Sequence, residues 1–219
     1  MASIAPIGIL GGTFDPVHNG HLRLALELAD GLGLARVRLV PCAQPPHREA
    51  PVASPGQRAK WIRVAITGEP RLRLDDRELL RDGPSYTVDT LDSMRREFPD
   101  TPLCLIMGRD VMAGLDEWRD WRRLFDYAHI ILVERPDADG ELPAAVAAEL
   151  EERRDDDPAA LAAAAQGLIH VCSPPPLTIS GTRIRRLLAE GRSPRFLLPD
   201  VVLDEILDAG VYRRNPQPA

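Results

Sequence analysis

Residues 8–21 read GILGGTFDPVHNGH, an apolar run followed by a glycine-rich loop and a helical pattern. The run before the loop has the apolar character and the length of a buried strand. Gly11 and Gly12 allow positive φ angles and let a ligand approach the backbone closely. The loop ends at Pro16, and the helix should begin at residue 18 or 19. A strand, a tight loop and a helix in this order are typical of a parallel strand–helix–strand unit.

The rest of the chain repeats this alternation of short apolar runs and longer amphipathic stretches. Strands are predicted at residues 7–10, 37–40, 72–74, 103–107 and 130–133, with 168–171 as a further candidate. Helices are predicted over residues 22–32, 54–67 and 87–98. The pattern predicts an α/β fold, a Rossmann-like doubly wound parallel sheet of about five or six strands, with helices on both faces and a C-terminal helical segment. Such sheets bind ligands beyond the carboxyl ends of their strands, where the strand order switches.

Length and composition are those of a globular domain. The chain has 219 residues, of which 44% are apolar and 27% charged, enough to bury a substantial core. We expect one domain over residues 1–219, with a surface helical excursion at 137–167 and a C-terminal helical phosphate-binding segment at 180–213. No apolar run approaches the roughly 20 residues that span a bilayer. A net charge of −6 implies no general affinity for nucleic acid.

The cysteines point to a reducing compartment. Cys42, Cys104 and Cys172 are odd in number, widely spaced and set among apolar residues. Such a pattern favours reduced, buried thiols over a disulfide framework or a metal site. We therefore expect a cytoplasmic protein.

His18 and His21 lie three residues apart, so both project from one face of the first helical turn. A helix start presents unpaired N–H groups and the positive end of the helix dipole, and an imidazole can donate hydrogen bonds to phosphate oxygens. The pair therefore indicates a site for a phosphate chain. Three alternatives compete: a metal pair, which lacks a third ligand nearby, two ordinary surface histidines, and a dinucleotide-binding dehydrogenase. The G-x-G-x-x-G pattern of that last class is missing, as is the Walker A lysine motif.

A second helix start of this kind lies near the other end, in PPPLTISGTRIRRLLAEG at residues 174–191. Ser180 is a natural helix cap, Thr182 falls in the first turn, and Gly191 ends the helix. Arg185 adds a fixed cation to this helix start, which suits a phosphate. Alone, the pattern is typical of an ordinary capped helix; paired with the first motif, it indicates a shared phosphate site.

Together the two motifs resemble the signature of the nucleotidyltransferase superfamily. Residues 18–21 carry its H-x-G-H element, and residues 179–185 carry its I-S-[ST]-T-x-I-R element. Gly181 departs from the Ser or Thr that is common at that place. A contact from the backbone could survive this change, whereas a hydroxyl contact at residue 181 is not expected.

Four middle segments resemble one group within this superfamily, the bacterial nicotinate-nucleotide adenylyltransferases. They are Pro-Pro-His at 45–47, PSYTVDTL at 84–91, LIMGRD at 105–110 followed by Trp118, and AHIILVERP at 128–136. Each also has a plain structural explanation as a rigid loop, a helix cap or a packed strand, and at least one of Trp118 and Trp121 should pack in the core. The resemblance runs from about residue 7 to 213 and is weakest across 137–173.

The resemblance implies a role for each matching residue. Residues implied to bind ATP are Gly11, Gly12, Thr13, Phe14, His18, His21, Gly108, Asp110, Ser180, Thr182 and Arg185. Among them, His18, His21 and Arg185 would be catalytic, and Gly108 and Asp110 would contact the adenosine. Residues implied to bind nicotinate mononucleotide are His47, Ser85, Tyr86, Thr87, Trp118 and Arg135. His47 and Arg135 would approach its phosphate, and Trp118 would stack on its pyridine ring.

The implied activity is transfer of AMP from ATP to nicotinate mononucleotide, which gives deamido-NAD and pyrophosphate in NAD biosynthesis. The substrate phosphate would attack directly in line, without a covalent enzyme intermediate. The implied cofactor is Mg²⁺, bound mainly through the nucleotide phosphates, with no metal ligands from the protein. Two alternatives are another phosphate acceptor such as phosphopantetheine, and a nucleotide-sensing relative without turnover. The expected partners are the two substrates, without nucleic acid or membrane, and assembly into a homo-oligomer is left open.

Overall fold

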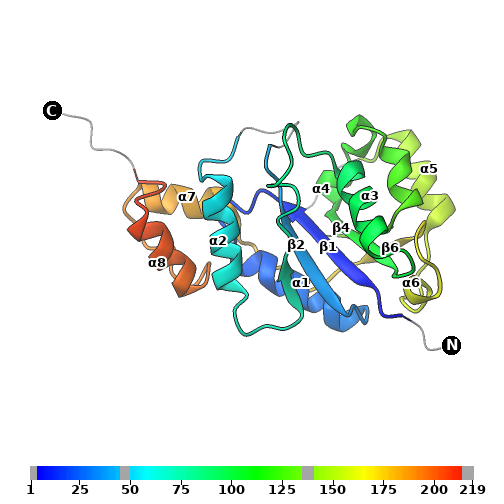
Figure 1. Ribbon diagram of the computed structural model, residues 1–219, viewed down its shortest axis with the longest axis horizontal. Helices are drawn as coiled ribbons and strands as arrows, with labels where there is room; N and C mark the ends of the chain where they lie inside the picture. The colour runs from blue at the N-terminus through cyan, green and yellow to red at the C-terminus, as the bar shows by residue number, and fades with distance from the viewer. Residues whose placement is uncertain (1–3, 45–49, 135–140, 214–219) are drawn as a thin grey trace.

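The structure is a computed structural model that describes residues 4–44, 50–134 and 141–213. Within these residues six strands form one wholly parallel sheet in the order β3-β2-β1-β4-β5-β6 (Figure 1). The strands are β1 (Ile7–Gly12), β2 (Arg36–Pro41), β3 (Leu72–Leu74), β4 (Leu103–Gly108), β5 (His129–Val133) and β6 (Ile169–Cys172). The α/β class and all six strands agree with the sequence pattern, so both predictions are confirmed.

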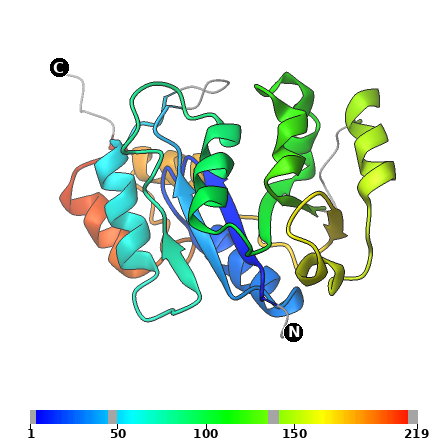
Figure 2. The ribbon, with the colours of Figure 1, turned by 45° about the vertical axis from the view of Figure 1, so that its right-hand side comes forward.

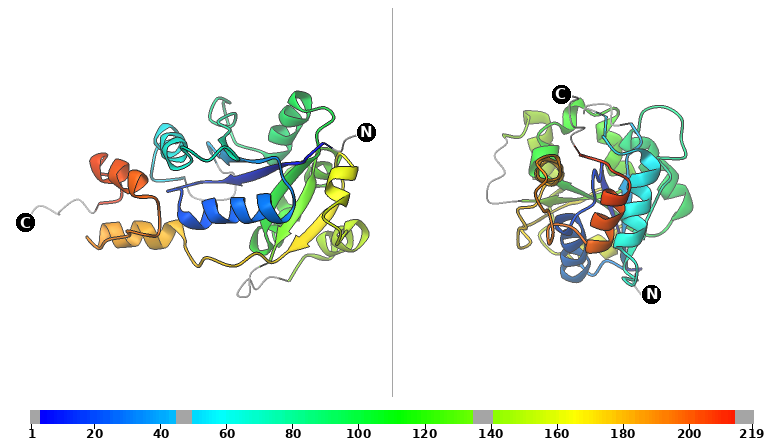
Figure 3. Two further views of the ribbon diagram at one scale, coloured as in Figure 1. Left: turned by 90° about the horizontal axis from the view of Figure 1, so that it is seen from below. Right: turned by 90° about the vertical axis from the view of Figure 1, so that its left-hand side faces the viewer.

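Helices cover both faces of the sheet, as predicted. The α-helices are α1 (Asn19–Gly31), α2 (Pro55–Ala65), α3 (Thr87–Glu97), α4 (Arg109–Met112), α5 (Ala144–Arg153), α6 (Ala160–Ala163), α7 (Gly181–Ala189) and α8 (Asp200–Asp208). Two short 3₁₀ helices, η1 (Leu115–Glu117) and η2 (Trp121–Asp126), follow α4. Helix α1 lies on one face of the sheet and α3 on the other (Figure 3), and α2 packs in the same apolar cluster as α1.

The remaining helices lie at opposite ends of the molecule. Helices α5 and α6 form the described part of the predicted excursion and lie beside β6, at the far end from α7 and α8 (Figure 2). Helix α8 packs against α2. Within the described ranges, no helix combines the length and the apolar character needed to cross a bilayer.

The core consists of two apolar clusters, and successive residues along a strand contribute side chains to one cluster and then to the other. On β4, Leu105 belongs to one cluster and Ile106 to the other, because successive side chains of a strand point to opposite faces. Leu28 of α1 packs in the cluster with Ile106, and Met94 of α3 packs in the cluster with Leu105. Strand β5 is buried along its whole length. Near-continuous apolar strands of this kind are what a parallel sheet covered on both faces requires.

The strand order reverses direction at the centre of the sheet. From β1 the chain moves to β2 and β3 on one side, whereas β4, β5 and β6 follow on the other side. The topological switch point therefore lies between β1 and β4. Strand β1 ends at Gly12 and β4 ends at Gly108, so the loops after these two glycines open onto the expected ligand crevice.

The two glycines after Leu10 do not use the positive φ angles that their lack of a side chain allows. Gly11 and Gly12 remain in β1, where they pair with Val40 and Pro41 of β2, and this pairing requires extended backbone. The left-handed turn falls instead at Phe14, with φ 48°. A Cβ on Gly11 would have no heavy atom within 4 Å, so the strand end faces open space, as close approach by a ligand requires.

His129 on β5 is a completely buried imidazole with both ring nitrogens engaged. Nδ1 accepts a hydrogen bond from the Leu168 N–H at 3.1 Å, and Nε2 lies 2.9 Å from the Ala164 carbonyl oxygen. A neutral ring with its proton on Nε2 satisfies both contacts. Burial lowers the pKa of His129, because desolvation disfavours the charged ring.

The free energy of unfolding should therefore fall as pH drops below about 6.5, the ordinary pKa of histidine. In that range the unfolded chain takes up a proton at His129 that the folded chain resists, so the stabilisation is complete above this pH and is lost below it. Urea unfolding at pH 7.5 and pH 5.5 measures the effect. In His129→Gln, which cannot titrate, the loss between the two pH values should be smaller than in wild type. An equal loss in both proteins would contradict the assignment.

Candidate active site

The loop after β1 is fixed by hydrogen bonds to α2 and to the segment that precedes α2. Arg58 of α2 is completely buried and donates from Nη1 to the Thr13 carbonyl oxygen at 2.6 Å. The Asp15 carboxylate accepts hydrogen bonds from the backbone N–H groups of Val52, at 3.0 Å, and Ala53, at 3.1 Å. Asp15 itself is only 5% exposed. These contacts fix the loop at the switch point of the sheet.

His18 and His21 lie together at the start of α1, as their spacing predicts. His18 caps the helix with extended backbone, and its N–H donates to Nδ1 of His21 at 3.3 Å. The two imidazole rings stack, with centroids 3.6 Å apart and an interplanar angle of 17°. The His21 ring also meets the Phe14 ring at 4.9 Å in an edge arrangement. Two imidazoles and the loop backbone therefore border one small volume.

The N-terminus of α1 offers fewer backbone donors than the sequence indicates. The Asn19 N–H donates to the Leu197 carbonyl oxygen at 3.0 Å, and the Asn19 side chain donates from Nδ2 to the Phe196 carbonyl oxygen at 3.0 Å. The sequence analysis expected unpaired N–H groups at this helix start, and for the N–H of Asn19 this expectation is wrong. Residues 196 and 197 precede α8, so the partner is far away in the chain and no local pattern identifies it.

Helix α7 brings the second motif against the first. Ser180 caps α7 by accepting from the Arg183 N–H at 3.3 Å, as predicted. Arg185 donates from Nη1 to the Asp15 carbonyl oxygen at 2.7 Å, and from Nη2 to Thr182 Oγ1 at 3.3 Å. Asp15 and Arg185 are 170 residues apart in the chain. The two helix starts therefore fold together at one place.

The close contact between the Asp15 carbonyl oxygen and the start of α7 explains why residue 181 is a glycine. A Cβ at this position would lie 2.9 Å from the Asp15 carbonyl oxygen and 3.3 Å from Arg185 Nη1. The first of these distances is shorter than a Cβ tolerates, so a serine or threonine here would require the loop or α7 to shift. Glycine at 181 lets α7 begin directly against the loop that follows β1.

Gly108 and Asp110 lie together where β4 passes into α4. A Cβ on Gly108 would lie 2.5 Å from Asp110 Oδ1, so the carboxylate of Asp110 folds back over the glycine. Arg109, between them, donates from Nη1 to Glu134 Oε1 at 2.9 Å, which joins the ends of β4 and β5. The predicted adenosine contacts thus lie at the switch point, next to β1.

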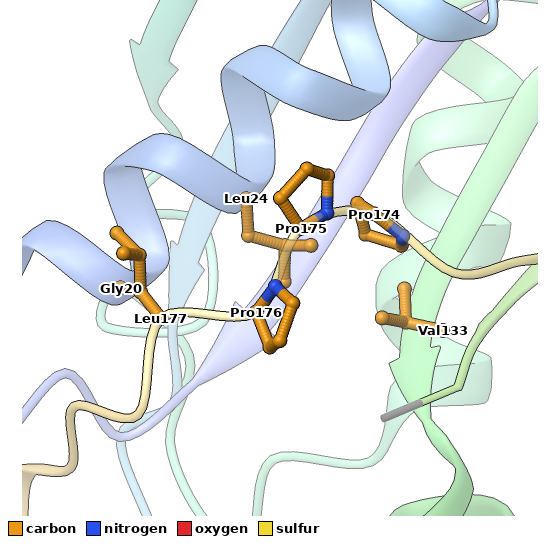
Figure 4. A pocket seen from close by; sticks show the side chains of 7 residues that line it. All are labelled: Gly20, Leu24, Val133, Pro174, Pro175, Pro176 and Leu177. Carbon is orange, nitrogen blue, oxygen red and sulfur yellow. The ribbon is translucent and has the colours of Figure 1, made fainter. Parts of the chain in front are cut away.

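A shallow pocket beside the start of α1 is a feature that the sequence analysis missed. The pocket lies between α1, the end of β5 and the segment that follows β6 (Figure 4). Its lining residues are Gly20, Leu24, Val133, Pro174, Pro175, Pro176 and Leu177. The three consecutive prolines, which fix φ along the segment, are the sequence signal that could have identified it.

The predicted acceptor residues gather at the start of α3. Ser85 Oγ accepts a hydrogen bond from the Ala43 N–H at 3.0 Å, and the Ser85 N–H donates to the Gln44 carbonyl oxygen at 3.0 Å. Tyr86 caps α3, Thr87 begins it, and both are half-buried. The loop after β2 therefore meets the start of α3 beside the switch point.

Trp118 and Trp121 take different roles. Trp121 is 7% exposed and belongs to the core, with the Arg122 guanidinium 4.3 Å above its ring. Trp118 follows η1 and is half-buried, and the next residue, Arg119, lies over the Tyr86 ring at 4.8 Å. The expectation that at least one tryptophan packs in the core is confirmed, and Trp118 lies in the segment that meets α3.

Glu78 is a second feature that the sequence analysis missed. Its buried carboxyl group lies beside the residues predicted to bind the mononucleotide. Glu78 Oε1 accepts a hydrogen bond from Thr90 Oγ1 at 2.6 Å, and burial raises the pKa of Glu78. No local pattern distinguishes Glu78 from surface glutamates. His47 and Arg135, both predicted to approach the acceptor phosphate, lie outside the described residues.

Metal ligands do not converge anywhere in the described part of the chain. No group of three or more His, Cys, Asp and Glu side chains there could hold an ion. The Asp15 carboxylate is engaged by protein donors. A divalent cation at this site therefore fits best if phosphates and water supply its ligands.

Comparison with known proteins gives close relatives over nearly the whole chain. A family model described as cytidylyltransferase-like matches residues 9–187. A Methylococcus capsulatus protein named "Probable nicotinate-nucleotide adenylyltransferase" is 49% identical, over 95% of this chain and 100% of that relative. A Halorhodospira halophila protein with the same name is 48% identical, over 94% of each chain.

Solved structures share the fold. Plasmodium falciparum nicotinic acid mononucleotide adenylyltransferase complexed with NaAD has a TM-score of 0.71 to this chain at 16% identity. The match covers 95% of this chain and 97% of that one. At this identity the likeness concerns the architecture alone.

Proposed function

The chain belongs to the nicotinate-nucleotide adenylyltransferase family, and we propose how its residues carry out the reaction of that family. The enzyme transfers AMP from ATP to nicotinate mononucleotide and releases deamido-NAD and pyrophosphate, a step of NAD biosynthesis. Membership in this family disfavours both alternatives, another phosphate acceptor and a nucleotide sensor without turnover. We further propose that the whole chain acts as one nucleotidyltransferase domain in the cytoplasm.

One observation supports the site above all others, the hydrogen bond from Arg185 to the Asp15 carbonyl oxygen. It brings a fixed cation to the loop that precedes His18 and His21. In our proposal the triphosphate of ATP lies over residues 11–14, where the two imidazoles and Arg185 donate hydrogen bonds to its oxygens. The cations and N–H donors are in place before ATP arrives, so little reorganisation accompanies binding.

The adenosine then extends toward the end of β4. We propose that the adenine ring packs against the surface formed by Gly20, Val133 and the triproline segment 174–176. Asp110, folded over Gly108, would accept hydrogen bonds from the ribose. This arrangement places the α-phosphorus near His18 and His21, at the switch point of the sheet.

Nicotinate mononucleotide would bind on the side of α3. Ser85, Tyr86 and Thr87 offer backbone and hydroxyl donors to its carboxylate, and Trp118 offers an aromatic face to the pyridine ring. His47 and Arg135 remain the proposed contacts of its phosphate. That phosphate is ionised at neutral pH, so no general base is required.

Transfer then proceeds by direct in-line attack. A phosphate oxygen of the mononucleotide forms a bond to the α-phosphorus while the bond from this phosphorus to the bridging oxygen breaks, and the electron pair leaves with pyrophosphate. His18, His21 and Arg185 would stabilise the charge that develops on the phosphates. Mg²⁺, held mainly by the phosphates and water, would neutralise part of that charge.

Pyrophosphate release tests the function directly. The purified protein is assayed with ATP and Mg²⁺ in the presence of nicotinate mononucleotide, nicotinamide mononucleotide or phosphopantetheine. We expect the highest kcat/KM with the nicotinate form. Release with phosphopantetheine alone, or with none of the three, would overturn the proposed function.

Trp118→Ala should raise the KM for nicotinate mononucleotide by about tenfold, since stacking of an aromatic ring contributes on the order of 1 kcal/mol or more. The KM for ATP should change by less than about twofold, because Trp118 lies on the acceptor side. Steady-state kinetics with each substrate varied in turn measures both constants, and Trp118→Phe should recover most of the affinity. Equal increases for the two substrates would contradict the stacking role.

A further inference from the structure

Tyr212, near the end of the described chain, contacts the loop after β1 from a third direction. It is buried, and its hydroxyl donates to Asp15 Oδ1, 197 residues earlier in the chain. The ring lies 6.0 Å from that of Trp61 in α2. Its backbone has φ 67°, a left-handed conformation that is unfavourable for a tyrosine and persists only where its surroundings hold it.

The Asp15 carboxylate is shared among several donors. It accepts from the backbone N–H groups of Val52 and Ala53 and from the Tyr212 hydroxyl. Arg185 Nη1 is 3.8 Å from Asp15 Oδ2, beyond hydrogen-bond distance, whereas it is 2.7 Å from the Asp15 carbonyl oxygen. Arg185 therefore hydrogen-bonds to the backbone of Asp15, and its charge is paired with the Asp15 carboxylate only at the longer distance of 3.8 Å.

This arrangement leaves the charge of Arg185 only partly compensated. Its side chain is 33% exposed, whereas that of Asp15 is 5% exposed. Arg58, completely buried, binds the Thr13 carbonyl oxygen and has no carboxylate within 4 Å in the described part of the chain. The loop thus carries two guanidinium groups close to a single buried carboxylate, an excess of positive charge that suits a triphosphate.

We propose that Tyr212 is a positioning residue for ATP, because its hydroxyl engages Asp15 and keeps the Arg185 guanidinium available to the triphosphate. The proposal rests on the proposed role of Arg185 in ATP binding. Without the hydroxyl, Asp15 loses one donor, and its carboxylate becomes a stronger acceptor for the cation next to it. Arg185 would then close onto the carboxylate and withdraw from ATP.

Tyr212 can fill this role over the working pH range. Burial and the neighbouring Asp15 carboxylate raise the pKa of the Tyr212 hydroxyl above its ordinary value. The group therefore stays protonated and acts as a donor to Asp15.

Tyr212→Phe removes the hydroxyl and keeps the ring. We expect the KM for ATP to rise about tenfold, the size of effect that a hydrogen bond to a charged group supports. The KM for nicotinate mononucleotide should stay within about twofold of wild type, whereas kcat at saturating ATP should fall as well, because Arg185 also acts on the charge that develops in the transition state. Calorimetric titration with a non-hydrolysable ATP analogue should show the same loss of affinity without any turnover.

Tyr127→Phe is the matched control. The Tyr127 hydroxyl likewise takes part in one hydrogen bond, which it accepts from Arg123, but this exposed pair lies at the end of η2, before β5. The same chemical deletion there should leave both KM values and the affinity for the analogue unchanged. A fall in affinity in this control equal to that in Tyr212→Phe would overturn the proposal.

A double-mutant cycle tests whether Tyr212 acts through Arg185. In an Arg185→Gln background, Tyr212→Phe should cause no further loss of affinity for the ATP analogue, because the cation that the hydroxyl protects is gone. Additive losses would overturn the proposal, as would equal increases in KM for both substrates. If the analogue binds tenfold more weakly to Tyr212→Phe but wild type releases no pyrophosphate, the proposed function fails while the positioning role stands.

Discussion

His21→Ala should lower kcat for pyrophosphate release by about a hundredfold or more, the effect expected when a donor to developing charge is lost. His21 stacks on His18 and its ring meets that of Phe14 in the loop after β1, and in our proposal its Nε2 donates to phosphate oxygens. The KM for ATP should change less than kcat, because the interaction strengthens as the bond to pyrophosphate breaks. Quenched-flow or steady-state pyrophosphate assays measure the effect.

Two conservative variants separate this chemistry from helix capping. His21 Nδ1 also accepts the His18 N–H, so alanine removes a cap as well as a donor. The amide oxygen of His21→Asn can accept the same bond, and this variant should recover about 1 kcal/mol of the lost stability while remaining inactive. His21→Gln, whose amide nitrogen reaches as far as Nε2, should recover part of kcat. Full activity in His21→Asn would remove the imidazole from the mechanism.

Arg185→Gln should lower kcat/KM for ATP by about a hundredfold, since a charged hydrogen-bond donor to phosphate contributes on the order of 3 kcal/mol. The guanidinium is anchored by the Asp15 carbonyl oxygen and by Thr182, so its position does not depend on ATP. Part of the loss should appear in KM, because the charge acts in the ground state as well as in the transition state.

Arg183→Gln provides the matched control on the same helix. Arg183 lies two residues before Arg185 and is exposed, so the substitution removes one positive charge from α7 without touching the loop. The control should keep kcat/KM within about threefold of wild type, as expected for an exposed charge. A comparable loss in both variants would indicate that α7 acts only through its overall charge.

Much of the fold follows from local patterns. All six strands, the serine caps of α2 and α7 and the start of α1 can be predicted, because apolar periodicity and capping residues act over a few positions. The end of α2 is less well determined, since the pattern continues to residue 67 and the helix ends at Ala65. No strong stop signal separates these two positions.

The site is predictable only where its residues belong to short motifs. The stacking of His18 and His21 follows from their spacing on one helical turn. The contact of Asn19 with Leu197 and that of Asp15 with Tyr212 join positions about 180 residues or more apart, and nothing local in either partner encodes them. The roles of His47 and Arg135 remain predictions.

The contact between Asn19 and Leu197 bears on how the protein can be shortened. A truncation placed just after the helix that carries Arg185 would keep every recognisable motif and still delete the carbonyl that satisfies the first N–H of α1. The Asn19 N–H would then lack its carbonyl partner, and the N-terminal end of α1 would lose its contact with the segment that precedes α8. Trimmed versions for crystallisation or ligand screening should therefore retain α8 and, because Tyr212 contacts Asp15, the chain through at least Tyr212.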